Sequence, residues 1–157
     1  MKAVLLVVGK TVNKQFVDLI DDYVGRLKHY IGFELQVIPD LKNTKSLSEE
    51  QQKTMEGEQI LKTIMPGDVL VLLDEHGKEF RSIEFSKWME NKMQTVNKRL
   101  IFVIGGPYGF SDAVYAAARE KLSISKMTFS HQMIRLIFVE QLYRAMTIIK
   151  GEPYHHE

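Results

Sequence analysis

The sequence contains no cysteine. This absence excludes disulfide bonds, metal sites built on thiolates, and covalent catalysis by a cysteine nucleophile. A chain without disulfides is typical of the cytoplasm, and we expect a cytoplasmic location for this protein.

Long apolar runs are also missing. No stretch approaches the roughly 20 apolar residues that a membrane-spanning helix needs. The apolar run at residues 3–8 is too short for the core of a signal peptide. We therefore expect no membrane partner.

Neither sign of charge is in excess. The chain has 21 Lys and Arg against 20 Asp and Glu, a net charge of +1. A nucleic-acid partner normally requires clustered basic residues, so any RNA-binding surface here has to be a local patch. The five histidines show no H-E-x-x-H or similar spacing, and we expect no metal.

Apolar runs alternate with amphipathic segments along the chain. The pattern predicts strands at 3–8, 33–38, 69–73, 100–104 and 121–125, and helices at 14–30, 48–65, 82–96, 111–119 and 131–150, with Asn13, Ser48 and Ser82 as helix caps and a loop at 74–79. Strands that alternate with helices predict a three-layer α/β fold with a mostly parallel sheet. The length fits a single domain over residues 1–157.

The last predicted helix, residues 131–150, is apolar around most of its circumference. Such a helix is buried on several sides. A domain of this size does not cover it fully, so we expect a partner chain and, most simply, a homodimer.

Two loops follow predicted strands and are unlike simple connectors. Residues 105–110 are rich in glycine, and residues 123–132 are polar. In open α/β sheets, ligands bind outside the carboxyl ends of the strands. The spacing is not that of a dinucleotide motif, and Pro107 has no N–H to donate. The glycines alone leave a ligand loop and a plain turn equally open.

Several groups could carry chemistry. His131 and Arg135 lie one turn apart on the same face of a helix. Tyr154 and His155 lie in the C-terminal tail, where an aromatic ring and an imidazole could contact a nucleobase. Taken singly, His131 is more often a surface residue, and the tail more often a frayed end. No G-x-S-x-G elbow is present, which argues against a serine hydrolase.

Five segments together form a specific pattern, although no single one does. They are Leu72-Leu73-Asp74 with Gly77-Lys78, Ile104-Gly105-Gly106-Pro107-Tyr108-Gly109, Leu122 to His131, Glu140-Gln141-Leu142-Tyr143-Arg144-Ala145 and Pro153-Tyr154-His155. In this order they resemble the bacterial family of large-subunit ribosomal RNA pseudouridine N3-methyltransferases, RlmH, within the SPOUT superfamily. The resemblance covers the whole chain. Ser130 departs from it, because many members have proline there.

The resemblance implies a C-terminal trefoil knot, the α/β-knot of the SPOUT fold, and a homodimer packed through the last helix. It implies that S-adenosylmethionine binds at Leu73, Gly105, Ile124, Ser125, Lys126, Met127, Thr128 and Phe129. The implied substrate is a pseudouridine in a 23S rRNA stem-loop, within the assembled 70S or 50S ribosome. We expect Gly105 and Gly106 to let the backbone approach the cofactor closely.

The absence of cysteine leaves nitrogen or oxygen as the methyl acceptor. Carbon methylation through a covalent adduct needs a cysteine, which is absent, whereas the N3 imide must lose a proton to a base or be stabilised as an anion by a cation. The candidates for these roles are His155, Tyr154 and Arg144, with His131 and Arg135 nearby across a dimer interface. Two alternatives remain open: a non-catalytic α/β ligand-binding dimer and a tRNA-directed SPOUT methyltransferase.

Overall fold

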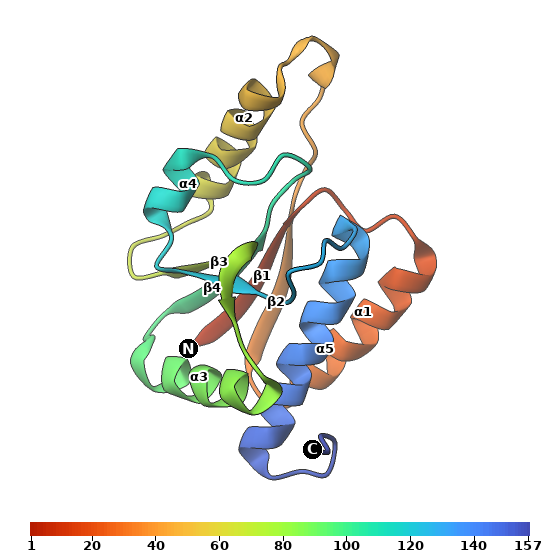
Figure 1. Ribbon diagram of the computed structural model, residues 1–157, viewed down its shortest axis with the longest axis vertical. Coiled ribbons are helices and arrows are strands. Elements are labelled where there is room, and N and C mark those ends of the chain that lie inside the picture. Colours follow the sequence, from red (N-terminus) through yellow and green to blue (C-terminus); the bar gives the residue numbers. More distant parts are fainter.

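The computed structural model describes all 157 residues (Figure 1). Its elements are β1 (Lys2–Val8), α1 (Lys14–Leu27), β2 (Gly32–Ile38), the short 3₁₀ helix η1 (Thr44–Ser46), α2 (Glu49–Lys62), β3 (Val69–Glu79), α3 (Ser82–Thr95), β4 (Arg99–Ile104), α4 (Asp112–Ala117), β5 (Glu120–Ser123) and α5 (His131–Lys150). The predicted alternation of strands and helices is confirmed. None of the helices combines the length and the apolar character needed to cross a membrane.

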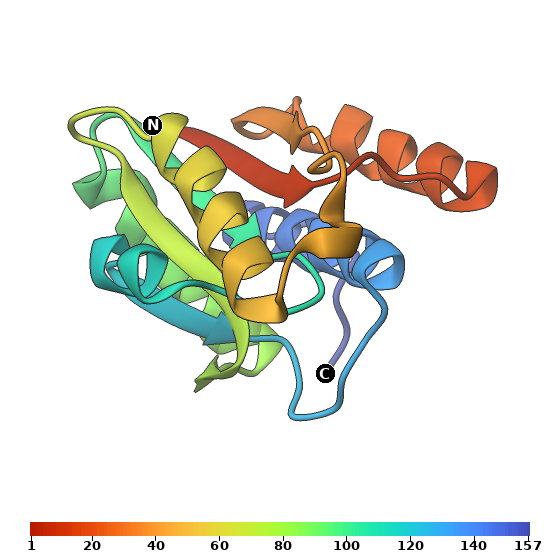
Figure 2. The ribbon, with the colours of Figure 1, turned by 90° about the horizontal axis from the view of Figure 1, so that it is seen from above.

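The five strands form one sheet in the order β2-β1-β4-β3-β5, and every neighbouring pair is parallel. Alternate residues of β1 face opposite sides: Leu5 packs with α1, α3 and α5, whereas Leu6 packs with α2 and α4. The sheet is therefore the middle of three layers (Figures 1 and 2). Strands buried on both faces account for the continuous apolar runs in the sequence.

Helix α5 lies between α1 and α3 (Figure 1). One side of it is buried within the chain, through residues such as Phe138, Leu142 and Met146. Other apolar side chains stay accessible, among them Met133 and Ile137. One chain thus covers only part of the apolar surface, and the homodimer stays a prediction.

Two of the three predicted helix caps are confirmed. The Asn13 side chain accepts hydrogen bonds from the next turn, and Ser48 forms a capping box with Gln51. The predicted cap at Ser82 is wrong. Arg81 precedes the first turn of α3 there, and its backbone N–H donates to the Glu84 carboxylate at 2.8 Å.

The predicted loop at 74–79 is wrong, because β3 continues to Glu79. After a register shift that follows Leu73, Lys78 and Glu79 pair with β5. A Cβ on Gly77 would lie 2.6 Å from the Leu122 nitrogen, so only glycine permits this close approach. The charged residues and the glycine in segment 74–79 predicted a turn from the local sequence. Pairing with β5, which is distant in the sequence, makes the segment part of a strand. Strand β5 also ends at Ser123, two residues earlier than expected.

Candidate functional site

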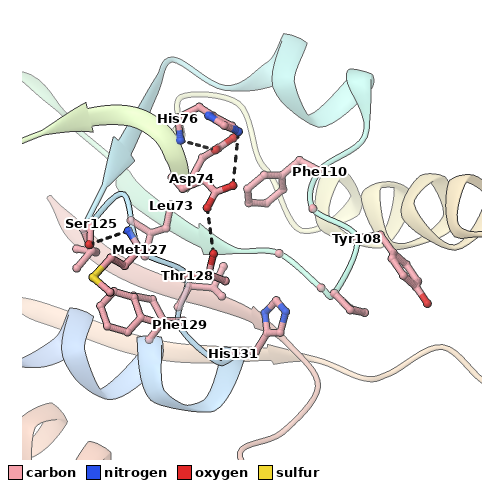
Figure 3. Close-up of a pocket in the computed structure, with 18 of the residues that line it drawn as sticks. Leu73, Asp74, His76, Tyr108, Phe110, Ser125, Met127, Thr128, Phe129 and His131 are labelled. Carbon is pink, nitrogen blue, oxygen red and sulfur yellow. Dashed lines mark hydrogen bonds and ion pairs between the residues drawn. The ribbon is translucent and has the colours of Figure 1, made fainter.

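A pocket of about 430 Å³ lies beside residues 73–76 in the middle of β3 and at the carboxyl ends of β4 and β5 (Figure 3). Its walls come from three segments: 73–76, 104–110 and 124–134. Apolar side chains such as Leu73 and Phe129 line it beside polar ones such as Ser125 (Figure 3). This is the edge of a parallel sheet at which ligands bind.

Seven of the eight residues proposed for the cofactor line this pocket. They are Leu73, Gly105, Ile124, Ser125, Met127, Thr128 and Phe129. Lys126 belongs to the same loop but does not line the pocket. Its side chain is 85% exposed and its ammonium lies 3.7 Å from Glu79.

Hydrogen bonds shape the polar loop that forms the third wall. The Ser123 hydroxyl donates to the Ser125 carbonyl at 2.9 Å, and the Ser125 hydroxyl accepts from the Met127 N–H at 3.0 Å. Thr128 donates to the Glu75 carboxylate at 3.3 Å, which joins this loop to the end of β3. Ser130, the departure from the family pattern, caps α5 by accepting from the Met133 N–H.

The two glycines after β4 pack closely against side chains of the same chain. A Cβ on Gly105 would lie 3.0 Å from the Phe110 ring, and one on Gly106 would lie 2.2 Å from a carboxylate oxygen of Glu56. A larger residue at either position therefore requires the Phe110 ring or the flexible end of the Glu56 side chain to shift. The close approach of the backbone to a cofactor stays a prediction.

The pocket wall carries negative charge. Its lining includes Asp74 and Glu75 but no lysine or arginine. Asp74 accepts from the His76 N–H at 2.9 Å and from the Tyr115 hydroxyl. Burial acts to raise the pKa of Asp74, but these hydrogen bonds outweigh it and hold the pKa below its ordinary value. Asp74 is therefore an ionised carboxylate in a fixed position.

His131 is the catalytic candidate that lies in the pocket (Figure 3). Burial lowers the pKa of its imidazole, and the charge of Arg135 lowers it further, against an opposing hydrogen bond with the Gly105 backbone. The ring is therefore neutral near pH 7 and free to accept a proton.

The other candidates form a second group, here called the C-terminal cluster: Glu140, Arg144, Tyr154 and His155. Arg144 donates to Glu140 at 2.6 Å and lies 3.2 Å from Nδ1 of His155. The Tyr154 hydroxyl donates to Glu140 at 3.0 Å, and the Arg144 guanidinium stacks 4.8 Å from the Tyr154 ring. Burial first, and then Tyr23 and Glu140, raise the pKa of Tyr154, which keeps its hydroxyl protonated.

The pocket and the C-terminal cluster do not meet within one chain. None of the four cluster residues lines the pocket. Arg144 follows His131 by 13 residues on α5, which corresponds to about 20 Å along a helix. The sequence-predicted candidates are thus divided between two places.

Arg135 belongs to neither place. Its side chain is 2% exposed and does not line the pocket. It donates to the Val8 carbonyl at 2.8 Å and to the Thr11 hydroxyl at 3.1 Å. Arg135 therefore fastens the start of α5 to the loop after β1, a positioning role in place of the contact with substrate that we expected.

Sequence reasoning missed other members of the pocket, among them Asp74, Phe110 and Tyr115. Asp74 comes directly after the predicted buried strand 69–73, and this placement could have marked it. Tyr115 gives no such signal, because it lies on a short helix and reaches Asp74 only through the fold.

The fold and the pocket define an α/β protein with a candidate ligand site at the edge of a parallel sheet where ligands bind in such folds. Residues 1–155 match a family model described as "Predicted SPOUT methyltransferase". The chain therefore belongs to the SPOUT methyltransferase family, whose fold implies the C-terminal trefoil knot and whose methyl donor is S-adenosylmethionine.

Curated relatives are similar over their full length. Proteins named "Ribosomal RNA large subunit methyltransferase H" are 70% identical in Phocaeicola vulgatus and 68% identical in Bacteroides fragilis, over 157 residues and 100% of both chains in each case. The protein of that name from Porphyromonas gingivalis is 57% identical over the same length.

Proposed function

We propose that this methyltransferase transfers a methyl group from S-adenosylmethionine to N3 of a pseudouridine in a 23S rRNA stem-loop, on the assembled ribosome in the cytoplasm. The observation that carries the proposal is the full-length likeness to relatives named as large-subunit rRNA methyltransferases. The pseudouridine, the N3 position and the ribosomal context come from the family resemblance.

The pocket fits the methyl donor in size, polarity and charge. Leu73, Ile124 and Phe129 offer apolar surface for an adenine ring, and the pocket volume of about 430 Å³ is in the range of small-molecule sites. The negative charges of the Asp74 and Glu75 carboxylates attract a cationic ligand. When bound, S-adenosylmethionine supplies an electrophilic methyl group on a positively charged sulfur.

The chain's own groups have separate tasks toward the acceptor. A pseudouridine N3 must lose its proton, and the neutral imidazole of His131 is placed in the pocket to accept one. Arg144 stabilises the resulting imide anion. Tyr154 serves as a hydrogen-bond donor, since its raised pKa rules out a role as a base at neutral pH.

The His155 ring also has a nitrogen that can donate a hydrogen bond. When Arg144 donates to Nδ1 of the ring, the proton of the neutral imidazole lies on Nε2. This Nε2 is buried and has no hydrogen-bond partner in the chain. A carboxylate oxygen of Glu157 lies 4.0 Å from it, so the C-terminal tail must shift before an acceptor atom on the target base can reach it.

Catalysis by these groups requires two copies of the chain. Because the pocket and the C-terminal cluster lie about 20 Å apart along α5, we propose a homodimer in which one protomer's cluster reaches its partner's pocket. Accessible apolar residues of α5, Met133 and Ile137 among them, provide surface for this contact. An isologous interface would form two equivalent composite sites.

Mass spectrometry of RNA from a strain that lacks the gene tests the proposal. We expect 23S rRNA to lose methylation at one pseudouridine and to regain it when the gene is restored. A methyl group lost from tRNA would support the tRNA-directed alternative. No loss in any RNA, together with no binding of S-adenosylmethionine in calorimetry, would support a non-catalytic dimer.

A further inference from the structure

Helix α2 carries a buried carboxyl group that the proposed chemistry does not use. Glu56 is 5% exposed. Its Oε2 accepts a hydrogen bond from the Gln52 side chain at 3.2 Å, whereas its Oε1 is buried and has no partner. An unpaired buried carboxylate oxygen is rare in folded proteins.

Burying this carboxyl group costs folding free energy, so the stability of α2 does not explain why a glutamate lies at position 56. Burial raises the pKa of Glu56, and the charge of Asp40 raises it further, against the hydrogen bond from Gln52. An apolar side chain of similar size would avoid the cost of desolvating a carboxyl group. The position of Glu56 therefore has to be explained by what its carboxyl group contacts.

The unpaired oxygen faces the pocket wall from outside. A Cβ on Gly106 would lie 2.2 Å from Oε1 and 2.8 Å from the carboxyl carbon, so the carboxyl group occupies the space beside the Gly106 backbone. Gly106 lines the pocket, and its carbonyl accepts from the Gly109 N–H at 3.2 Å in a tight turn. Glu56 thus supports the turn that forms the second wall.

The next residue of α2 makes an equally close contact. A Cβ on Gly57 would lie 2.3 Å from the Ser111 hydroxyl oxygen, and Ser111 caps α4. Glu56 and Gly57 therefore press against the two ends of segment 106–111. Through these contacts α2, which contributes no residue to the pocket lining, fixes the shape of the wall.

We infer that Glu56 is a positioning residue for the methyl-donor pocket, and that its carboxyl group holds the turn at 105–109 in the shape that binds the donor. This inference rests on the proposed function only for the identity of the ligand. The packing of α2 against the turn is a property of the chain itself.

Calorimetry with S-adenosylmethionine tests the inference in a series of variants. We expect Glu56→Ala to weaken binding about tenfold, because a displaced pocket wall no longer matches the ligand. Glu56→Gln keeps the volume and should restore binding to within about threefold of wild type. Glu58→Ala, an exposed glutamate on the same helix, is the matched control and should leave binding unchanged.

A double-mutant cycle tests the contact itself. Gly106→Ala should weaken binding through its clash with the carboxyl group. When it is combined with Glu56→Ala, the new Cβ enters the vacated space, so the double variant should bind no worse than Glu56→Ala alone. Additive losses would overturn the proposed contact, and unchanged binding in Glu56→Ala would overturn the inference.

Hydrogen exchange separates this inference from the proposed function. In Glu56→Ala, the amides of 105–110 should exchange faster, while those of β1 stay as in wild type. This readout needs no ligand, so it holds even if the wild-type chain fails to bind S-adenosylmethionine. If Glu56→Ala does not fold, the Glu56→Gln and Gly106→Ala variants are compared in the same way, and unaltered exchange and binding in Gly106→Ala would overturn the inference.

Discussion

The first turn of α5 borders a shaped pocket, whereas its second half holds the C-terminal cluster, whose charged and aromatic side chains contact one another. The pocket draws its walls from three strand ends of the same chain. The cluster draws its members from one helix and the tail that folds back on it. The same helix therefore serves ligand binding at one end and polar chemistry at the other.

The pocket proposed to bind the methyl donor and the cluster proposed to take part in catalysis therefore lie in different parts of the chain. Everything proposed to hold the methyl donor is present in one chain. Of the groups proposed to act on the target base, His131 lies in the pocket, whereas Arg144 is about 20 Å away along the helix. Affinity for the donor should therefore be a property of the protomer, and turnover a property of the dimer.

The largest effect is expected from a substitution that disrupts the C-terminal cluster and leaves the pocket unchanged. We expect Arg144→Ala to lower methylation of ribosomes about a hundredfold or more, because it removes the cation that stabilises the imide anion. The affinity for S-adenosylmethionine should not change in calorimetry. Lys150→Ala, an exposed cation in the last turn of α5, is the control and should methylate normally. Weaker binding of S-adenosylmethionine by Arg144→Ala would contradict the separation of donor binding from the C-terminal cluster.

Mixed dimers sharpen the comparison. Gly105→Val should abolish donor binding through its clash with Phe110, and Arg144→Ala should abolish turnover. When the two inactive variants are mixed and allowed to exchange subunits, each heterodimer regains one intact composite site. Random exchange gives about one quarter of wild-type activity. Activity that stays at the level of the separate variants would contradict a site shared between subunits.

The anionic wall should favour the methyl donor over its demethylated product, because transfer removes the positive charge on sulfur. We expect Asp74→Asn to weaken binding of S-adenosylmethionine about tenfold, with a much smaller effect on S-adenosylhomocysteine. Calorimetry with both ligands measures the ratio. Glu75→Gln is the matched comparison, and its effect should be smaller because its side chain is more exposed. Equal losses for both ligands would show that Asp74 acts by shape.

The smallest expected effect concerns pH and the pocket histidine. Burial and Arg135 place the pKa of folded His131 below the ordinary 6.5. As the pH falls through about 6.5, the unfolded chain binds the proton first, so stability is full above that pH and declines below it. His131→Asn should remove this part of the slope, measured as the melting temperature between about pH 7.5 and pH 5.5. An unchanged slope would show that His131 titrates normally.

The sequence predicts well whatever depends on local signals. Buried strands are continuous apolar runs, and the caps Asn13 and Ser48 lie next to the turns they stabilise. The pocket follows from the general rule that parallel strands end at one edge. For this reason the loops at 105–110 and 123–132 could be expected at one edge of the sheet, whereas the assignment of Gly105 and Phe129 to the cofactor came from the family resemblance.

Contacts between distant segments could not be predicted. Arg135 reads as an accessible helical cation, but its partners are Val8 and Thr11, more than 120 residues earlier. Glu56 lies in a charged helix with nothing to mark it, and only the fold places it against Gly106. Likewise, the sequence groups His131 with Arg144, although the length of α5 separates them.

The hydrogen bond from Arg135 to the Val8 carbonyl, at the end of β1, also has a consequence for folding during synthesis. The first strand is complete after eight residues, yet the hydrogen bonds from Arg135 to Val8 and Thr11 form only when residue 135 has been made. Parallel pairings and ties of such long range make folding slow. A chain whose synthesis is interrupted before residue 124 lacks the third wall, which is part of the lining of the methyl-donor pocket.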